Sequence, residues 1–290
     1  MRIAVGIITK GRPAILAATA CAMAQQTMPP ATLIIAPASS QDVAGLPADL
    51  PGLVVAPGPT GTTLQRNTVL EHAAGHDLLV FFDDDFLPHP RFLEICAAVF
   101  AARPGLVCAT GTVLRDGASG AGFSLAEGQR LLAELPPHPA DPLGCSATFG
   151  AYGCNMVVRV APVLAGGYRF DPDLPLYGWL EDLDFSRRIS GGGVVQMHGA
   201  LGIHLGIKLG RQSGLRLGYS QVANPIYLAR RGSLSWGYAL KTLLRNLARN
   251  LARAPRPEAH VDRRGRLRGN LLALGDVLRG RMRPDRVLAL

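Results

Sequence analysis

Three consecutive carboxylates, Asp83, Asp84 and Asp85, directly follow the five apolar residues 78–82. A continuous apolar run of this length is typical of a strand buried on both faces of a parallel sheet. The acids then lie where the strand leaves the sheet at its carboxyl end, the edge at which open α/β sheets bind ligands. Clustered carboxylates repel one another unless a cation offsets their charge, and Mg²⁺ and Mn²⁺ prefer oxygen ligands. The pattern indicates a divalent-metal site, with a solvated acidic loop as the alternative.

A second acidic group, Glu181, Asp182 and Asp184, lies at the start of a helix predicted over 179–189. Acids in a first turn complement the helix dipole, and this structural role accounts well for Asp184. It accounts less well for Glu181 and Asp182, which follow a Trp at the end of a loop rich in Pro and Gly. A carboxylate in an apolar setting at a pocket rim has a raised pKa, which suits a general base.

Two histidines, His198 and His204, follow a short strand predicted at 194–197. Imidazole can join carboxylates around manganese, so a histidine near the acidic cluster is a candidate third ligand. We choose His204 for this role. An ordinary surface or core position is the alternative for either residue.

Strands that alternate with helices are expected to position these groups. Apolar, β-branched runs predict the strands, and Ala-rich or amphipathic stretches predict the helices. This order predicts an α/β fold with a mostly parallel central sheet and right-handed crossovers. The predicted strands are 3–8, 33–36, 53–55, 78–82, 107–113, one that ends at Arg159, and 194–197. The predicted helices are 14–26, one that carries 64–67, 91–100, 124–135, 179–189, 240–254 and 271–278.

The 290 residues carry a net charge of +9 that is unevenly distributed. Residues 1–204 have 12 Lys and Arg against 17 Asp and Glu, whereas residues 205–290 have 18 against 4. A basic segment of this kind binds polyanions such as phosphates or anionic lipid. The five cysteines are scattered, and we expect them to be reduced. The sequence predicts neither a signal peptide nor a transmembrane helix, so a cytoplasmic location is expected.

The basic segment contains an amphipathic helix predicted over 240–254. Its leucines share one face and its cations line another. One interpretation is that the leucines pack on the domain or on a second subunit in a homo-oligomer. The other is a peripheral helix on an anionic membrane surface, such as the inner face of the plasma membrane. No nucleic-acid-binding motif is present, so no nucleic-acid partner is predicted. The leucines are Leu240, Leu243, Leu244, Leu247 and Leu251.

Several motifs, in this order, resemble those of family 2 glycosyltransferases, which have the GT-A fold. The resemblance covers about residues 1–205. Segment 218–225 is similar to bacterial members that act in polysaccharide assembly. The motifs are the opening strand and loop 7–13, Arg66-Asn67, the DxD-like Asp83-Asp84-Asp85, Gly153-Cys154-Asn155-Met156, the ED motif Glu181-Asp182, and His204.

The resemblance implies an inverting transfer of a sugar from a nucleotide-diphosphate sugar donor to a hydroxyl of a saccharide or lipid-linked saccharide. Asp182 would be the base, with Glu181 the second choice. The metal, Mn²⁺ or Mg²⁺, would be held by Asp83, Asp85 and His204. The donor would be contacted by Thr9, Arg12, Arg66, Asp83 and Asp84, and Asp84 could substitute for either neighbouring acid.

The implied division is a transferase domain over 1–205 and a basic, mainly helical extension over 206–290. Within the domain, 1–115 would form the nucleotide-binding half and 116–205 the acceptor-side half. One departure from the family concerns the end of the second strand, where members commonly have an acidic pair that contacts the base. Here the sequence reads Ala36-Pro37-Ala38-Ser39, so it does not identify the nucleotide of the donor. A nucleotidyltransferase of similar fold and a non-catalytic sugar- or nucleotide-binding relative are the alternative functions.

Overall fold

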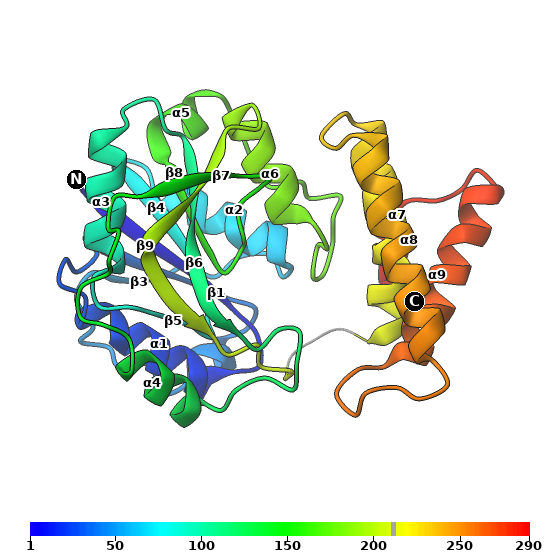
Figure 1. Ribbon diagram of the computed structural model, residues 1–290, viewed down its shortest axis with the longest axis horizontal. Coiled ribbons are helices and arrows are strands. Elements are labelled where there is room, and N and C mark those ends of the chain that lie inside the picture. Colours follow the sequence, from blue (N-terminus) through cyan, green and yellow to red (C-terminus); the bar gives the residue numbers. More distant parts are fainter. Residues whose placement is uncertain (210–212) are drawn as a thin grey trace. The chain divides into compact units, whose positions relative to one another are not determined.

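The protein, seen here as a computed structural model, is described for residues 1–209 and 213–290 (Figure 1). Its contacts divide the chain into two compact units. The first contains Met1–Thr60, Leu64–Arg169 and the described part of 185–210. The second contains Gly61–Thr63, Phe170–Asp184 and the described part of 211–290. Each unit is described separately below.

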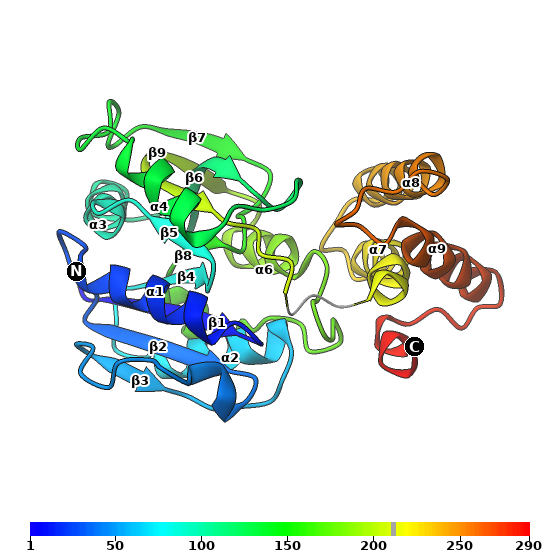
Figure 2. The same ribbon diagram turned by 90° about the horizontal axis from the view of Figure 1, so that it is seen from below.

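A mixed sheet forms the centre of the first unit, with strand order β3-β2-β1-β4-β8-β6-β9-β5, while β7 pairs with β9 (Figure 2). The four N-terminal strands are parallel to one another. Among the described strands, only β5, β7 and β8 run in the opposite direction. The strands are β1 (Ile3–Thr9), β2 (Thr32–Pro37), β3 (Leu53–Val55), β4 (Leu78–Asp83), β5 (Phe86–Pro88), β6 (Cys108–Asp116), β7 (Cys145–Thr148), β8 (Asn155–Arg159) and β9 (Val194–His204).

The central strand β4 forms the core because each of its five apolar residues is at most 1% exposed. Odd-numbered side chains of β1 face one side of the sheet, where they pack with helices α1 (Pro13–Ala24) and α3 (Phe92–Ala102). On the other side, a Cβ at Gly6 would lie 2.1 Å from Val69 of helix α2 (Thr62–His72). Strand β1 is therefore covered on both faces, as the sequence predicted for a parallel sheet.

Strand β9 is longer than predicted. The expected strand 194–197 continues through both histidines to His204. Glycines at 199 and 202 interrupt the apolar pattern, yet the fold requires one of them, because a Cβ at Gly202 would lie 2.2 Å from the ring of Phe86. The short strands β5 and β7 were not predicted. The remaining helical elements of this part of the chain are η1 (Ser40–Val43), α4 (Leu125–Ala133), α5 (Val160–Ala165) and α6 (Glu181–Ser190).

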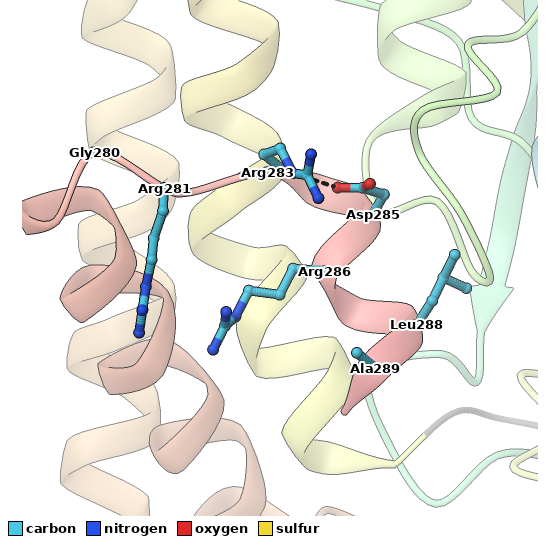
Figure 3. A pocket seen from close by; sticks show the side chains of 7 residues that line it. All are labelled: Gly280, Arg281, Arg283, Asp285, Arg286, Leu288 and Ala289. Atoms are coloured by element: carbon cyan, nitrogen blue, oxygen red, sulfur yellow. Dashed lines mark ion pairs between the residues drawn. The ribbon is translucent and has the colours of Figure 1, made fainter.

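The second unit is mainly helical. Its core contains Tyr219 and Leu243. The predicted helix 271–278 lies within the longer Arg263–Leu278, whereas the predicted helix 240–254 overlaps Trp236–Arg253 and extends one residue beyond its end. Among the described residues, no helix is both long and apolar enough to cross a membrane. A pocket of about 500 Å³ at its C-terminal end is lined by Gly280, Arg281, Arg283, Asp285, Arg286, Leu288 and Ala289 (Figure 3). The helices are α7 (Gly214–Arg230), α8 (Trp236–Arg253), α9 (Arg263–Leu278) and η2 (Pro284–Ala289).

Candidate active site

Of the three acids, Asp83 ends β4, and Asp84 and Asp85 form the turn that leads into β5. Asp83 and Asp85 both face His204, the last residue of β9: their carboxylate oxygens lie 3.9 and 3.5 Å from its Nε2 atom. Asp84 is fully buried and turns to Thr9 and Arg12. The structure thus brings together the two acids and the histidine that the sequence suggested as metal ligands.

These three residues form a donor set that suits a divalent ion. Each of Asp83, Asp85 and His204 offers one ligand atom, and the three atoms lie within 4.8 Å of one another. Among the described residues this is the one such group. Two carboxylates and an imidazole are the ligand types that Mn²⁺ accepts, and two carboxylates would also suit Mg²⁺. The residues present therefore fit the predicted metal.

His204 is oriented by two residues that the sequence did not suggest. Its Nδ1 atom lies 2.8 Å from Oδ1 of Asp116 and 3.3 Å from the hydroxyl of Tyr152. That hydroxyl also donates to Oδ2 of Asp116 at 3.2 Å. A carboxylate on one nitrogen leaves the other nitrogen of the ring facing the site, an arrangement common for metal-binding histidines. Asp116 and Tyr152 therefore hold Nε2 of His204 toward Asp83 and Asp85.

Asp84, which is buried, forms an ion pair with the partly buried Arg12. The guanidinium of Arg12 lies 2.5 Å from Asp84 and 3.1 Å from Asp85, so one cation serves both carboxylates. Thr9 donates its hydroxyl to Asp84 at 2.7 Å. Burial raises the pKa of Asp84 to about 7, although the charge of Arg12 opposes this. Thr9, Arg12 and Asp84 thus form a linked group at the ends of β1 and β4.

Asp85 is held in its charged form. Burial alone would raise its pKa, but hydrogen bonding to His204 and the charge of Arg12 lower it to about 2. The backbone N–H of Ile207 also donates to Asp85 at 2.7 Å. A carboxylate that stays ionised and is fixed from several sides is ready to bind a cation without further rearrangement.

Arg66 and Gln65 lie on α2 beside this edge of the sheet. Arg66 is 3% exposed and donates to Asp83 at 3.2 Å and to the carbonyl of Gly153 at 3.0 Å. Buried Gln65 donates to the carbonyls of Thr9 and Ala36, which joins the ends of β1 and β2. The predicted donor-contacting residues Thr9, Arg12, Arg66, Asp83 and Asp84 therefore gather at one edge of the first unit.

A carboxylate is present near the end of β2, where the sequence analysis found none. Asp42 lies in η1, six positions after Ala36, and accepts from the backbone N–H of Gly11 at 2.5 Å. It also accepts from the N–H and hydroxyl of Ser39, which closes a capping box. Asp42 thereby fixes the loop after β1. The Ser39-to-Asp42 spacing is the sequence signal that could have identified it.

The acids Glu181 and Asp182 begin α6 and belong to the second unit. Glu181 is 6% exposed and Asp182 is half-buried. The preceding Leu180 has a φ of +73°, an unusual conformation for a branched side chain. Strained backbone of this kind is found at functional sites, where surrounding contacts hold it in place. Asn224 of α7 supports this turn by donating to the carbonyl of Trp179 at 2.9 Å.

The charge of His204 leads to a pH-dependent stability of the metal-free protein. Burial lowers the pKa of His204, but hydrogen bonds to Asp116 and Asp85 outweigh this and raise it to about 10. Because this exceeds the unfolded value of about 6.5, the stabilisation is complete below pH 6.5 and is lost as the pH rises toward 10. Urea unfolding with a chelator present should show that His204→Gln lowers the free energy of unfolding by on the order of a few kcal/mol near pH 6. The loss should be much smaller near pH 10. An equal cost at both pH values would contradict the predicted charge.

Comparisons with known proteins connect this architecture to glycosyltransferases. No family model matches the chain, and a search of curated protein sequences finds no match. Among solved structures, S. aureus TarS 1-349 in complex with UDP-GlcNAc superimposes with a TM-score of 0.57 at 15% identity, over 100% of this chain and 84% of that one. GalNAc-T7 with UDP, GalNAc and Mn²⁺ gives a TM-score of 0.56 at 13% identity, over 81% of this chain and 51% of that one.

A third similar structure is the mannosyltransferase PcManGT from Pyrobaculum calidifontis in complex with GDP-Man and Mn²⁺. It gives a TM-score of 0.52 at 16% identity, over 99% of this chain and 85% of that one. All three are glycosyltransferases, and at these identities the likeness concerns the fold. The mixed sheet, with its parallel N-terminal half and flanking helices, therefore has the GT-A glycosyltransferase fold that the sequence predicted.

Proposed function

We propose that the protein is an inverting, metal-dependent glycosyltransferase that moves a sugar from a nucleotide-diphosphate sugar to a hydroxyl acceptor. The observation that carries this proposal is the convergence of Asp83, Asp85 and His204 at the end of the parallel half of the sheet. In open α/β sheets that edge is where ligands bind. The similar structures with UDP-GlcNAc, or with GDP-Man and Mn²⁺, support a donor of this class.

In this proposal, Asp83, Asp85 and His204 hold the metal, which when bound would neutralise charge on the departing nucleoside diphosphate. Thr9, Arg12, Arg66, Asp83 and Asp84 form the donor side. Arg12 is positioned by Asp84, so its guanidinium is fixed before donor arrives. Asp85 is in turn fixed by Arg12 and Ile207. A site prepared in this way does not spend binding energy on ordering its own side chains.

Asp182 is proposed as the general base, with Glu181 as the second choice. The base takes the proton of the acceptor hydroxyl while its oxygen attacks the anomeric carbon. The bond from that carbon to the diphosphate oxygen breaks in the same displacement, so the configuration inverts. The backbone N–H of Leu183 lies 2.8 Å from Oδ1 of Asp182, which helps to fix the carboxylate. This geometry supports a base held at the first turn of α6.

The acceptor is proposed to be a saccharide or a lipid-linked saccharide, in cell-surface or exopolysaccharide assembly. We also keep the functional division into a transferase domain over 1–205 and a basic extension over 206–290. The nucleotide half would be 1–115 and the acceptor-side half 116–205. The carboxylate of Asp42 already accepts hydrogen bonds from Gly11 and Ser39. Its position therefore does not decide whether the base of the donor is uracil or guanine.

Thermal unfolding with a panel of nucleoside diphosphates, each with Mn²⁺ and with a chelator, tests the proposal. Ligands that bind only the folded state stabilise it by about 2.7 kcal/mol at a concentration 100 times Kd. We expect a rise in Tm of several degrees for one diphosphate, and only when Mn²⁺ is present. That result would also name the base of the donor.

The matching nucleoside monophosphate serves as the control, since it shares the base but offers fewer phosphate oxygens to a metal. Equal shifts with and without Mn²⁺ would contradict metal-assisted binding of the diphosphate. No shift with any nucleotide, in a well-folded sample, would favour a non-catalytic relative.

A further inference from the structure

Helix α8 has an exposed apolar stripe. Trp236, Leu240, Leu244 and Leu251 are 50, 48, 58 and 61% exposed, and Leu247 between them is half-buried. Their spacing of four, four, three and four residues places all five within one narrow arc of the helix. Large apolar side chains in a continuous row are unusual on the surface of a soluble domain and mark an interaction site.

The helix packs against the other helices of the second unit through a different face, which is centred on Asn250. Its side-chain amide donates to Gln221 at 2.9 Å and to Asn270 at 2.8 Å, while Arg263 donates to its oxygen at 3.1 Å. Ala239, Thr242 and Leu243 are the other buried residues of α8. This polar network fixes the rotation of the helix. Of the five leucines in the predicted amphipathic helix, Leu243 is buried, Leu247 is half-buried, and the other three are exposed.

A row of cations runs along the side of the helix that faces away from the apolar stripe. Lys241, Arg245, Arg249 and Arg253 follow one another at four-residue steps, and all are exposed. The helix contains no acidic residue. Over 213–290 the chain carries 16 Lys and Arg against 4 Asp and Glu. This cationic row therefore offers positive charge that no acidic residue of the same helix neutralises.

The arginines of the C-terminal pocket differ from this row. Arg281 and Arg286 both lie against the buried carboxylate of Asp276, at 2.8 and 2.6 Å, and Arg283 pairs with Asp285 (Figure 3). Two carboxylates offset two of these three positive charges and leave 3 − 2 = +1, so the pocket offers only a weak net attraction to an anion. The cationic row of α8 is the stronger candidate for an interaction with negative charge.

We propose that α8 binds the surface of an anionic lipid bilayer, with Trp236, Leu240, Leu244 and Leu251 inserted between lipids. Interfacial helices carry Trp and Leu on one face and Lys and Arg on the polar face, and α8 has this division. A second copy of this chain matches the surface less well, because it would bring the same excess of Lys and Arg over Asp and Glu. The proposal does not depend on the activity of the first unit.

Flotation of the full chain with lipid vesicles tests this proposal. The wild type should partition into vesicles that contain phosphatidylglycerol on the order of 100-fold more strongly than into phosphatidylcholine alone, and added salt should weaken the binding. The double variant Leu244→Ser/Leu251→Ser should lose at least about tenfold of the partitioning. Both replaced side chains are exposed, and circular dichroism checks that the fold persists.

The matched control is Leu143→Ser/Leu209→Ser, which removes two exposed leucines of the first unit, 46 and 70% exposed, and should bind as the wild type does. Equal binding by the α8 variant and the wild type would overturn the proposal, as would absence of wild-type binding to anionic vesicles. Sedimentation of the lipid-free protein tests the alternative that the stripe binds a second copy of this chain. Self-association that the α8 variant abolishes, without vesicle binding, would assign the stripe to a homo-oligomer instead.

Discussion

Replacing Asp182 with Asn is expected to slow glycosyl transfer by about 10²–10⁴-fold, the range that general acid–base catalysis contributes. The amide keeps the shape and hydrogen-bonding reach of the carboxylate but cannot accept the acceptor's proton. Binding of the metal and nucleotide should persist, since the predicted metal ligands belong to the first unit. Initial rates with a matched donor, together with the Mn²⁺-dependent thermal shift, measure the two effects separately.

The matched control is Glu181→Gln, an equally conservative change one residue away in the same first turn of α6. If Asp182 is the base, the glutamine variant should retain far more activity. The reverse order would transfer the role to Glu181. Full activity of Asp182→Asn would show that the base lies elsewhere.

Asp85→Asn is expected to weaken Mn²⁺ binding by at least about 100-fold, because even residues that only support metal ligands typically contribute 10–100-fold. The substitution removes a carboxylate whose pKa of about 2 keeps it charged at any working pH. It also leaves Arg12 and His204 with one partner fewer, so some loss of folding stability is expected. Calorimetric titration with Mn²⁺ measures the affinity directly.

Asp84→Asn provides the comparison, because the neighbouring residue faces away from His204. Its pKa is raised to about 7 by burial, so near neutral pH the folded protein already tolerates its neutral form. The amide oxygen can still accept from Thr9. We expect Mn²⁺ affinity to change little. A loss as large as that of Asp85→Asn would contradict the assignment of Asp83 and Asp85 as the ligands.

The first half of the fold could be predicted closely because its signals are local. Strand 53–55 agrees with β3, and the run 78–82 forms all but the last residue of β4. Both strands lie in the parallel half of the sheet. Burial on both faces explains the continuous apolar run of β4, whereas β3 is an edge strand with half-buried and exposed residues. Asp84 and Asp85 lie in the turn after β4, so the period of a strand does not fix their directions. Which acid faces which partner required the neighbouring strands.

The features that the sequence did not reveal depend on contacts between distant residues. Asp116 is 88 residues from His204, and Tyr152 is 52 residues away, so no spacing rule connects them. Strand β9 was underestimated because glycines at 199 and 202 accommodate other parts of the chain rather than an apolar pattern. The orientation of α8 is set by Asn250, whose partners lie on other helices. Periodicity found the amphipathic helix but could not tell which of its faces is covered.

The link from Ile207 back to Asp85 also sets an order of events during protein synthesis. The two residues are 122 positions apart, and β9 inserts between the earlier strands β6 and β5. At 5–20 residues per second, a ribosome needs roughly 6 to 24 s to make the intervening chain. Over that interval β5 lacks its hydrogen-bonded partner and Asp85 lacks both His204 and the N–H of Ile207. A nascent chain therefore cannot bring Asp83, Asp85 and His204 together, with the N–H of Ile207 on Asp85, until residue 207 has left the ribosome.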